Sequence, residues 1–462
     1  MIELPKLEGE TAIFGLGRSG IAAAQALLAS GNDVVAWDDT PLRDHNDIPS
    51  RDLTKDFGTP ARLLLAPGVP PSHPIAQAAH KAGVKIIGDM DLFQLARNQM
   101  DNVCVIGITG TNGKSTTTAL VHHILSENGW AVQMGGNIGT AVLSLDMPSD
   151  KKTAYVLELS SYQLELAQDF YADIGVWLNL TPDHLARHNT MENYAAAKAK
   201  LFASPEKMQA VIIGCDDDYG TAIANTLNTH PQLIRFFTST ADIEGASYEL
   251  GFDGTHLLHN NKAVMDMTQT YALRGVHNAQ NAAAAYGVGL VLGLSPDSMA
   301  VALTDFAGLA HRMQPVAQYK GIDFVNDSKA TNSEATRCAL AALHNIYWIA
   351  GGRAKDKTPE ASLAGLDTYY GNITHAYLIG EAATGFATTL APYMPCTIAA
   401  SLNEAVDKAA QDAQDETQPP KQATILLSPA CASFDQFTDF EARGDAFIAA
   451  VHAWIAQQEV GA

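Results

Sequence analysis

Residues 110–115, with the sequence Gly-Thr-Asn-Gly-Lys-Ser, have the composition of a loop that binds phosphate. Glycines let backbone N–H groups close around an anion, and a helix that starts after the loop adds positive potential. Lys114 can neutralise β- and γ-phosphates, and the Ser115 hydroxyl can bind Mg²⁺. The motif is shorter than the full P-loop pattern, but an apolar run at 103–108 predicts a preceding strand and 116–125 predict a following helix. We therefore expect an ATP site made by Gly110, Thr111, Asn112, Gly113, Lys114 and Ser115.

A second glycine motif, Gly-Leu-Gly-Arg-Ser-Gly at 15–20, matches the G-x-G-x-x-G pattern of dinucleotide-binding folds. It follows a predicted strand at 11–14, and another predicted strand at 34–37 ends at Asp38 and Asp39. An acid near this spacing holds a ribose in such folds. Taken alone, the unit fits NAD, another nucleotide, or a tight turn that binds nothing.

Two polar residues occur where strands are expected or end. Glu158 interrupts the apolar run at 155–159, where an unpaired carboxylate would be costly, so Mg²⁺ or a structural hydrogen bond must satisfy it. His184 ends the segment 179–184, which follows a predicted strand at 174–178. Open α/β sheets place ligands at the carboxyl ends of their strands, so His184 is either a ligand or a solvated side chain.

Strands and helices that alternate along the whole chain predict an α/β fold in three domains. The predicted domains are a Rossmann-like N-terminal domain at 1–98, a central P-loop ATPase-like domain at 99–308 and a C-terminal Rossmann-like domain at 309–462. Strands of the C-terminal domain are expected at 322–325, 347–350, 376–379 and 424–427. Polar loops follow the first, second and last of these strands, and should therefore share one edge of the sheet.

The composition limits the partners and the compartment. The 462 residues include 29 Lys and Arg and 50 Asp and Glu, a net charge of −21, which disfavours nucleic acid and anionic membranes as partners. The five cysteines are scattered and include no Cys-x-x-Cys pair, which indicates a reducing compartment. No signal-peptide core is present, and the apolar run at 282–294 is too short to span a bilayer. We expect a cytoplasmic monomer.

The combined motifs resemble those of the Mur ligases, and the resemblance covers nearly the whole chain. The similar motifs are 110–115, 158–161 (Glu-Leu-Ser-Ser), 179–184, 277–281 (His-Asn-Ala-Gln-Asn) and 311–312 (His-Arg). This resemblance implies an ATP-dependent, amide-forming ligase with one domain each for a UDP-sugar, ATP and an amino acid. Segments 326–332 and 428–437 resemble the D-glutamate-adding members, which implies UDP-N-acetylmuramoyl-L-alanine, D-glutamate and ATP as partners.

The resemblance also implies binding roles for single residues. Those for the UDP-sugar are Gly17, Arg18, Ser19, Asp39, Gly68 and Asn137. Those for ATP, besides the phosphate loop, are Asn278, Asn281, Arg312 and Asp327. Those for D-glutamate are Lys355, Ser433 and Phe440. One departure is Ala66, where relatives often have serine, and it leaves the uracil contacts open.

Catalysis in the family implies two Mg²⁺ ions and an acyl-phosphate intermediate. The residues implied to be catalytic are Lys114, His184, Lys198 and Lys329. The residues implied to hold metal are Ser115, Glu158, His184 and Lys198, with Lys198 carbamoylated by CO₂. Without the resemblance, residues 195–200 predict a helix face with solvated lysines, and Lys200 is the neighbouring competitor for the modification.

Two functions of other classes stay open on the sequence. An NAD-dependent oxidoreductase would use the motif at 15–20 and Asp38, but would leave the motif at 110–115 unexplained. A non-catalytic protein regulated by a nucleotide would bind ATP without releasing phosphate in response to an amino acid.

Overall fold

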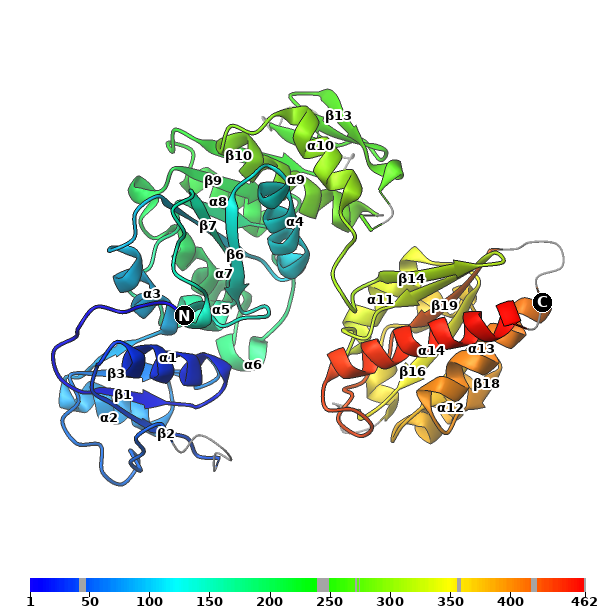
Figure 1. Ribbon diagram of the computed structural model, residues 1–462, viewed down its shortest axis with the longest axis horizontal. Helices are drawn as coiled ribbons and strands as arrows, with labels where there is room; N and C mark the ends of the chain where they lie inside the picture. The colour runs from blue at the N-terminus through cyan, green and yellow to red at the C-terminus, as the bar shows by residue number, and fades with distance from the viewer. Residues whose placement is uncertain are drawn as a thin grey trace. The chain divides into compact units, whose positions relative to one another are not determined.

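The computed structural model describes residues 1–40, 47–238, 249–270, 272–273, 275–354, 359–416 and 422–460. These residues form two compact units, 1–306 and 307–462 (Figure 1). Helices and strands alternate through both units, which confirms the expected α/β class. No helix among the described residues is both long enough and apolar enough to cross a membrane.

The first unit begins with a small parallel sheet. Its strands, in spatial order, are β2 (Val34–Trp37), β1 (Thr11–Phe14), β3 (Arg62–Leu65) and β4 (Lys85–Ile87). Its helices are α1 (Arg18–Ala29), α2 (Pro74–Ala82) and α3 (Asp89–Arg97). The expected strands at 11–14 and 34–37 are confirmed. Side chains of β1 alternate between two cores, with Phe14 packing in the core that contains α2 and Ile13 in the core that contains α1 and α3.

A nine-stranded sheet forms the rest of the first unit. Its spatial order is β13-β12-β11-β10-β9-β8-β5-β7-β6, parallel from β6 to β11 and antiparallel at the hairpin β11-β12-β13. The strands are β5 (Val103–Thr109), β6 (Ala131–Gly136), β7 (Thr153–Glu158), β8 (Ile174–Trp177), β9 (Ala210–Gly214), β10 (Leu233–Phe237), β11 (Leu250–Phe252), β12 (His256–His259) and β13 (Lys262–Asp266). The expected strands at 103–108, 155–159 and 174–178 are confirmed, with small shifts at their ends.

Seven α-helices accompany this sheet within the described residues. They are α4 (Lys114–Glu127), α5 (Ser161–Leu166), α6 (Leu185–His188), α7 (Met191–Ala199), α8 (Asp218–Thr226), α9 (Val276–Val291) and α10 (Pro296–Asp305). The apolar run that sequence assigned to a buried helix lies mostly in α9, where residues 279–289 are all buried. One hydrophobic core continues from α1 and α3 into the nine-stranded sheet, so the first two predicted domains share a compact unit.

The strand order of the large sheet brings three loops together. Strand β5 lies between β7 and β8, and all three run parallel. Ile108 pairs with Glu158, and Thr109 pairs with Trp177, so the three strands end at the same edge. The phosphate loop, Glu158 and the loop at 179–184 therefore lie at one carboxyl edge.

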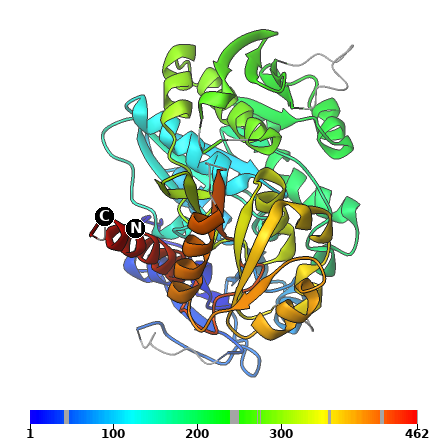
Figure 2. The ribbon, with the colours of Figure 1, turned by 90° about the vertical axis from the view of Figure 1, so that its right-hand side faces the viewer.

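The second unit is a six-stranded sheet between two layers of helices (Figure 2). Its strands, in spatial order, are β14 (Gln314–Tyr319), β15 (Ile322–Asn326), β19 (Ala423–Leu427), β16 (Ile346–Gly351), β17 (Ile373–Ile379) and β18 (Cys396–Ile398), with only β14 antiparallel. Its α-helices are α11 (Ser333–Ala342), α12 (Ala383–Leu390), α13 (Leu402–Glu416) and α14 (Phe440–Val460). All four strands expected here are confirmed. Because β15, β19 and β16 are neighbours, the three polar loops begin at one edge, as expected.

The glycines of the motif at 15–20 have different structural roles. A β-carbon on Gly20 would lie 1.9 Å from the carbonyl oxygen of Gly15, so α1 can approach β1 closely only with glycine there. Gly17 has no atom within 4 Å of the place where its β-carbon would be. Gly20 is therefore required by packing, whereas Gly17 faces open space.

We expect Gly20→Ala to lower the free energy of unfolding by about 3 kcal/mol, because the new methyl group overpacks against the backbone. Urea denaturation followed by circular dichroism measures this loss. Gly17→Ala is the matched control and should unfold close to the wild-type midpoint. Equal midpoints for the two variants would contradict the assignment of the packing role to Gly20.

Candidate functional site

The phosphate loop, residues 110–115, depends on two glycines. Gly110 has φ +155° and Gly113 has φ +81°, where other residues are strained. A β-carbon on Gly110 would lie 2.9 Å from Leu178 Cβ, and one on Gly113 would lie 2.1 Å from the Asn281 side-chain oxygen. The loop can therefore hold this shape only with glycine at both positions.

Lys114 begins α4 and its side chain lies back over the phosphate loop. Its Nζ donates to the carbonyl oxygens of Gly110, at 3.0 Å, and Thr111, at 2.8 Å. The ammonium is thus held beside the start of a 14-residue helix. A cation at this place can contact an anion that the loop and the helix N-terminus bind.

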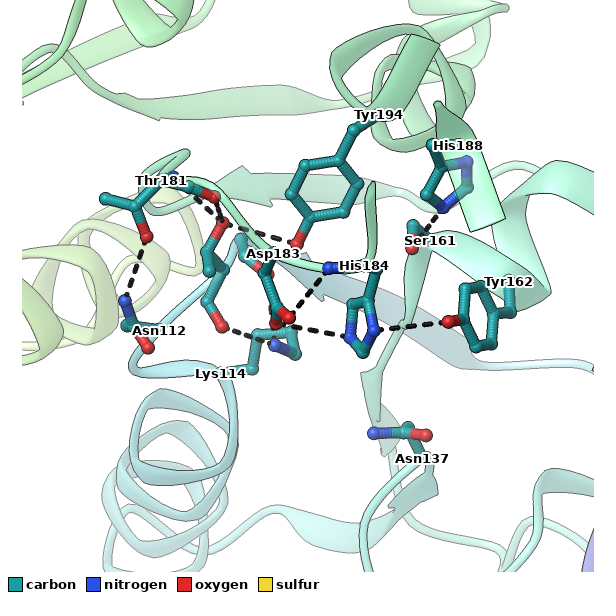
Figure 3. A network of polar contacts seen from close by, with 12 residues as sticks. Asn112, Lys114, Asn137, Ser161, Tyr162, Thr181, Asp183, His184, His188 and Tyr194 are labelled. Atoms are coloured by element: carbon teal, nitrogen blue, oxygen red, sulfur yellow. Dashed lines mark hydrogen bonds and ion pairs between the residues drawn. The ribbon is translucent and has the colours of Figure 1, made fainter. Parts of the chain in front are cut away.

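The loop after β8 is docked against the phosphate loop. The backbone N–H of Thr111 donates to the Asn179 carbonyl, and that of Asn112 donates to the Asn179 side-chain oxygen, each at 2.9 Å. Thr181 N donates to Thr111 Oγ1 at 3.0 Å, and Asn112 Nδ2 donates to Thr181 Oγ1 at 3.3 Å (Figure 3). These bonds fix the shape of one loop by the other.

A relay of side-chain hydrogen bonds continues from this pair of loops. Asn179 Nδ2 donates to Gln280 Oε1 at 2.5 Å, and Gln280 Nε2 donates to Asp216 Oδ2 at 2.7 Å. Asp216 also accepts from the backbone and hydroxyl of Thr238, just after β10. The sequence motif at 277–281 contains Gln280 but gave it no role, and Asp216 was not predicted. Asp216 could have been identified, because it follows a buried strand, as the other predicted site loops do.

Glu158 is 3% exposed and has a partner on each oxygen. Oε2 accepts from Ser115 Oγ and Oε1 accepts from Asn137 Nδ2, both at 2.7 Å. Glu158 is therefore satisfied by structural hydrogen bonds. The same arrangement places its carboxylate beside the Ser115 hydroxyl, and oxygen atoms of both kinds are ligands for Mg²⁺. Among the described residues, no three His, Cys, Asp or Glu side chains gather closely enough to hold a metal by themselves.

His184 lies on the surface of the same edge in a left-handed conformation, with φ +54°. Its Nε2 is 3.3 Å from Asp183 Oδ2, and its Nδ1 is 3.2 Å from the Tyr162 hydroxyl (Figure 3). Partial burial lowers the pKa of His184, with the charges of Lys198 and Lys114 acting in the same direction and Asp183 opposing them. The neutral ring that a metal ligand requires is therefore favoured.

Lys198 is 1% exposed, so the expectation of a solvated helix face is wrong for this residue. Its Nζ donates to the Gly110 carbonyl at 2.7 Å and lies 4.8 Å from the centre of the Tyr194 ring. Burial, and then the charge of Lys114, lowers the pKa of Lys198 well below the usual lysine range, against opposite effects of Asp183 and Glu158. Lys200 instead donates to the Glu165 carbonyl and does not reach the phosphate loop.

A cavity of about 320 Å³, the N-terminal cavity, lies between the first sheet and the edge of the second. Among the residues assigned to the UDP-sugar, those that line it are Gly17, Arg18, Ser19, Gly68 and Asn137. Arg18 also donates to the carbonyls of Gly139, at 2.8 Å, and Asn137, at 3.0 Å. The cavity thus combines the first glycine motif with the loop that follows β6.

Asp39 does not line this cavity, because its carboxylate is 3.3 Å from His73 Nε2. Asp38 lines it instead and accepts from the Leu16 backbone N–H at 2.6 Å. The sequence identified both acids as candidates. It could not show which one lines the cavity, because that depends on the direction in which each side chain points. Gln163 also lines the cavity and was missed, although it lies two residues after the motif at 158–161.

The second unit gathers its predicted residues around a buried arginine. Arg443 is 1% exposed and donates to the Ser328 side chain and carbonyl, at 3.0 and 2.8 Å, and to the Cys431 carbonyl, at 3.1 Å. Burial lowers the pKa of Arg443 to about 10. Lys329 Nζ lies 3.8 Å from the centre of the Phe440 ring. Arg443 was missed, because no spacing in the sequence marks it.

The remaining predicted residues divide between the units. In the first, Asn281 Nδ2 donates to Asn278 Oδ1 at 3.1 Å, so the two asparagines share a face of α9. In the second, Asp327 accepts from Ser428 Oγ at 2.8 Å, and burial raises the pKa of Asp327 to about 7, with Arg312 opposing. Ser433 is buried on the loop that carries Cys431. Lys355 lies outside the described residues.

Two protein-family models match the chain. The model described as Mur ligase middle domain matches residues 108–289, and the one described as Mur ligase, glutamate ligase domain matches residues 311–431. The chain is 45% identical to the UDP-N-acetylmuramoylalanine--D-glutamate ligase of Rhizobium meliloti (strain 1021), over 98% of each chain. It is also 45% identical to the protein of the same name from Brucella abortus (strain 2308), again over 98% of each chain.

Solved structures share the fold at low identity. The UDP-N-acetylmuramate-alanine ligase of Thermotoga maritima matches with a TM-score of 0.59 and 16% identity, over 96% of this chain and 100% of that chain. The UDP-N-acetylmuramoylalanyl-D-glutamyl-2,6-diaminopimelate--D-alanyl-D-alanyl ligase of Acinetobacter baumannii matches with a TM-score of 0.52 and 18% identity, over 79% and 81%. These likenesses confirm the architecture expected from the sequence.

We expect the stability of Lys198→Met to differ from wild type in a pH-dependent way. Because burial lowers the pKa of Lys198 in the folded protein, the unfolded wild-type chain binds more protons than the folded one below the usual lysine pKa of about 10.4, and wild-type stability rises with pH. The variant lacks this pH dependence. The amount by which its free energy of unfolding exceeds that of wild type should therefore shrink from about pH 7 to about pH 10. Urea titrations in CO₂-free buffer measure the difference.

Lys200→Met controls for the loss of a lysine in the same segment. The decisive comparison is the slope of the stability difference with pH. If the difference between Lys198→Met and wild type were constant over this range, Lys198 would not have the lowered pKa that its burial indicates.

Proposed function

Because the chain belongs to the Mur ligase family, we propose that it adds D-glutamate to UDP-N-acetylmuramoyl-L-alanine, with hydrolysis of ATP to ADP and phosphate. The proposed place of this reaction is the cytoplasmic synthesis of peptidoglycan precursor, by a monomer. One observation carries the proposal: the phosphate loop, the Ser115–Glu158 pair and the buried Lys198 amine share one sheet edge, in a chain whose relatives at 45% identity bear that enzyme's name. Mur ligases are ATP-dependent and use Mg²⁺.

The chemistry must make an amide from a carboxylate, which is a poor electrophile. The carboxylate of the UDP-sugar substrate attacks the γ-phosphorus of ATP, and ADP leaves with the electron pair of the broken P–O bond. The neutral amine of D-glutamate then attacks the acyl-phosphate carbon, loses a proton, and expels phosphate. Both steps depend mainly on positioning and on neutralising charge.

The phosphate loop is proposed to hold ATP. Lys114 is at the right place to exchange its contacts with the loop carbonyls for the β- and γ-phosphates. Asn278 and Asn281, at the start of α9, are proposed to contact the nucleotide, as are Arg312 and Asp327 of the second unit. The relay through Gln280 supports the loop by fixing Asn179.

The residues that the family resemblance assigns to magnesium fit that metal. Ser115 and Glu158 offer adjacent oxygen atoms, and His184 offers a neutral ring nearby. When bound, Mg²⁺ supplies positive charge beside the phosphates. The proposed second ion would use His184 and a carbamoylated Lys198. The protein holds Glu158 ready through Asn137, whose amide keeps the carboxylate turned toward Ser115.

The other two substrates have separate proposed sites. The N-terminal cavity would take the UDP-sugar through Gly17, Arg18, Ser19, Gly68 and Asn137, with Asp38 as the lining acid rather than Asp39. Ser433 and Phe440 would hold D-glutamate together with Lys329 and Lys355. Arg443 supports that role, because its buried guanidinium keeps the two loops of this site together and adds positive potential for two carboxylates.

Phosphate release should require ATP, Mg²⁺, UDP-N-acetylmuramoyl-L-alanine and D-glutamate together. We expect no comparable release when meso-diaminopimelate or L-lysine replaces D-glutamate, because the motifs at 326–332 and 428–437 resemble the D-glutamate-adding members. A coupled phosphate assay on the purified protein, with each component omitted in turn, measures this. Equal turnover with L-lysine would overturn the substrate assignment while leaving the family intact.

Lys198 should carry a carbamate in the active enzyme. Its neutral amine can attack the carbon of CO₂, forming an N–C bond and releasing one proton, and nearby Mg²⁺ would stabilise the anion. Enzyme equilibrated with ¹³C-bicarbonate should therefore show a ¹³C carbamate signal by NMR. Lys198→Ala should lose the signal and at least about 100-fold in kcat, the size of effect seen when a preorganised electrostatic contact is removed.

Lys200→Ala is the matched control for the modification and should keep the signal. A signal that persists in Lys198→Ala, or that is missing from wild type, would rule out carbamoylation at this position.

A further inference from the structure

Asp89, the first residue of α3, is a buried acid that the proposed chemistry does not use. It is 1% exposed, and the one charge acting on its carboxyl among the described residues is that of Asp91, which is also negative. Burial raises the pKa of Asp89, an effect that three hydrogen bonds only partly offset. A carboxyl group in this setting is costly for the fold unless it has a specific task.

The hydrogen bonds of Asp89 connect three elements of the first unit. Its Oδ1 accepts from the Met90 backbone N–H at 3.0 Å, and its Oδ2 accepts from Gln163 Nε2 at 3.3 Å. The side chain of Ser19, in the first turn of α1, makes the third hydrogen bond. Ser19 and Gln163 both line the N-terminal cavity, so Asp89 lies directly behind its wall.

The orientation of Gln163 depends on this contact. Its Oε1 accepts from the backbone N–H of Ser160, at 3.2 Å, and from the Ser160 hydroxyl, at 3.0 Å. With the oxygen thus engaged, the amide nitrogen points toward Asp89. Asp89 and Ser160 together therefore determine which atoms of Gln163 the cavity presents.

Asp91, two residues further on, gives a useful contrast. Its carboxylate is 4% exposed and accepts from the backbone N–H groups of Gly88, Gln168 and Asp169, at 2.8 to 2.9 Å. All three of these partners are main-chain groups that join two segments of the fold. Asp91 is thus bound to backbone, whereas Asp89 binds two side chains that line the N-terminal cavity.

We propose that Asp89 is a positioning residue for the UDP-sugar, and that it acts by holding Ser19 and Gln163 at the wall of the N-terminal cavity. The ligand chemistry that these groups suit is polar and neutral or anionic, such as sugar hydroxyls, an amide or phosphate oxygens. The inference rests on the proposed function, since it assigns the cavity to the UDP-sugar. Asp89 itself touches no substrate.

The test compares Asp89→Ala and Asp89→Asn with wild type, by calorimetry with UDP-N-acetylmuramoyl-L-alanine and by steady-state kinetics. Asp89→Ala should raise the Kd and KM for the UDP-sugar by about tenfold, the effect of losing a buried hydrogen bond. Its kcat at saturation and its KM for ATP should stay within about twofold, because the phosphate loop makes no contact with Asp89. Asp89→Asn keeps the size, but its amide has one accepting oxygen where Met90 N–H and Gln163 Nε2 both donate, so it should raise the Kd and KM for the UDP-sugar by a similar factor.

Asp91→Ala is the matched control and should lower Tm without changing the KM for the UDP-sugar. If Asp89→Ala does not fold, Asp89→Ser replaces it, since serine can still accept from Met90 N but is too short to reach Gln163. Unchanged UDP-sugar affinity in the alanine or serine variant, an equal rise in the KM for ATP, or wild-type affinity in the asparagine variant would each overturn the inference. Wild-type protein that does not bind the UDP-sugar at all would instead overturn the proposed function.

Discussion

The buried amine of Lys198 donates to the carbonyl of Gly110, and the arrangement of the candidate site depends on this one contact. It ties α7 to the first residue of the phosphate loop, while Tyr194 on the same helix lies 3.3 Å from Thr111 Oγ1. The loop is also held by Asn179, which the relay through Gln280 fixes. A glycine loop that is flexible in isolation is thus constrained by two other segments before any ligand arrives.

Such constraint matters because the protein as a whole is acidic. A net charge of −21 repels nucleotides and sugar phosphates at long range, so binding must rely on local positive groups. The first unit places Lys114 and the N-terminus of α4 at one edge of its large sheet, together with Lys198, whose pKa burial lowers well below the usual lysine range. The second unit places Arg443 behind two loops, where it donates to the Ser328 hydroxyl and to two carbonyl groups. Positive potential is therefore concentrated where anions are expected.

Much of the fold could be predicted because its signals are local. Strand β1 was predicted to its exact bounds, and the phosphate loop was recognised from six consecutive residues. The parts that could not be predicted depend on contacts between distant residues. Lys198 lies in an alanine-rich helix with no clear apolar face, so only packing decides that its side chain points inward. Asp216 and Gln280 are 64 residues apart, and their hydrogen bond has no sequence signature. Residues of α3, just before the predicted boundary at 98, share one buried core with residues of both sheets of the first unit.

Gly113 has a consequence for inhibitor design. Any side chain at this position would meet the amide of Asn281 on a neighbouring helix while adopting a backbone conformation that suits glycine. Every missense change in a glycine codon introduces a β-carbon, so no substitution at this turn leaves the local geometry intact. A compound that binds the main chain of the turn would thus contact a surface on which resistance mutations carry an immediate cost to the enzyme.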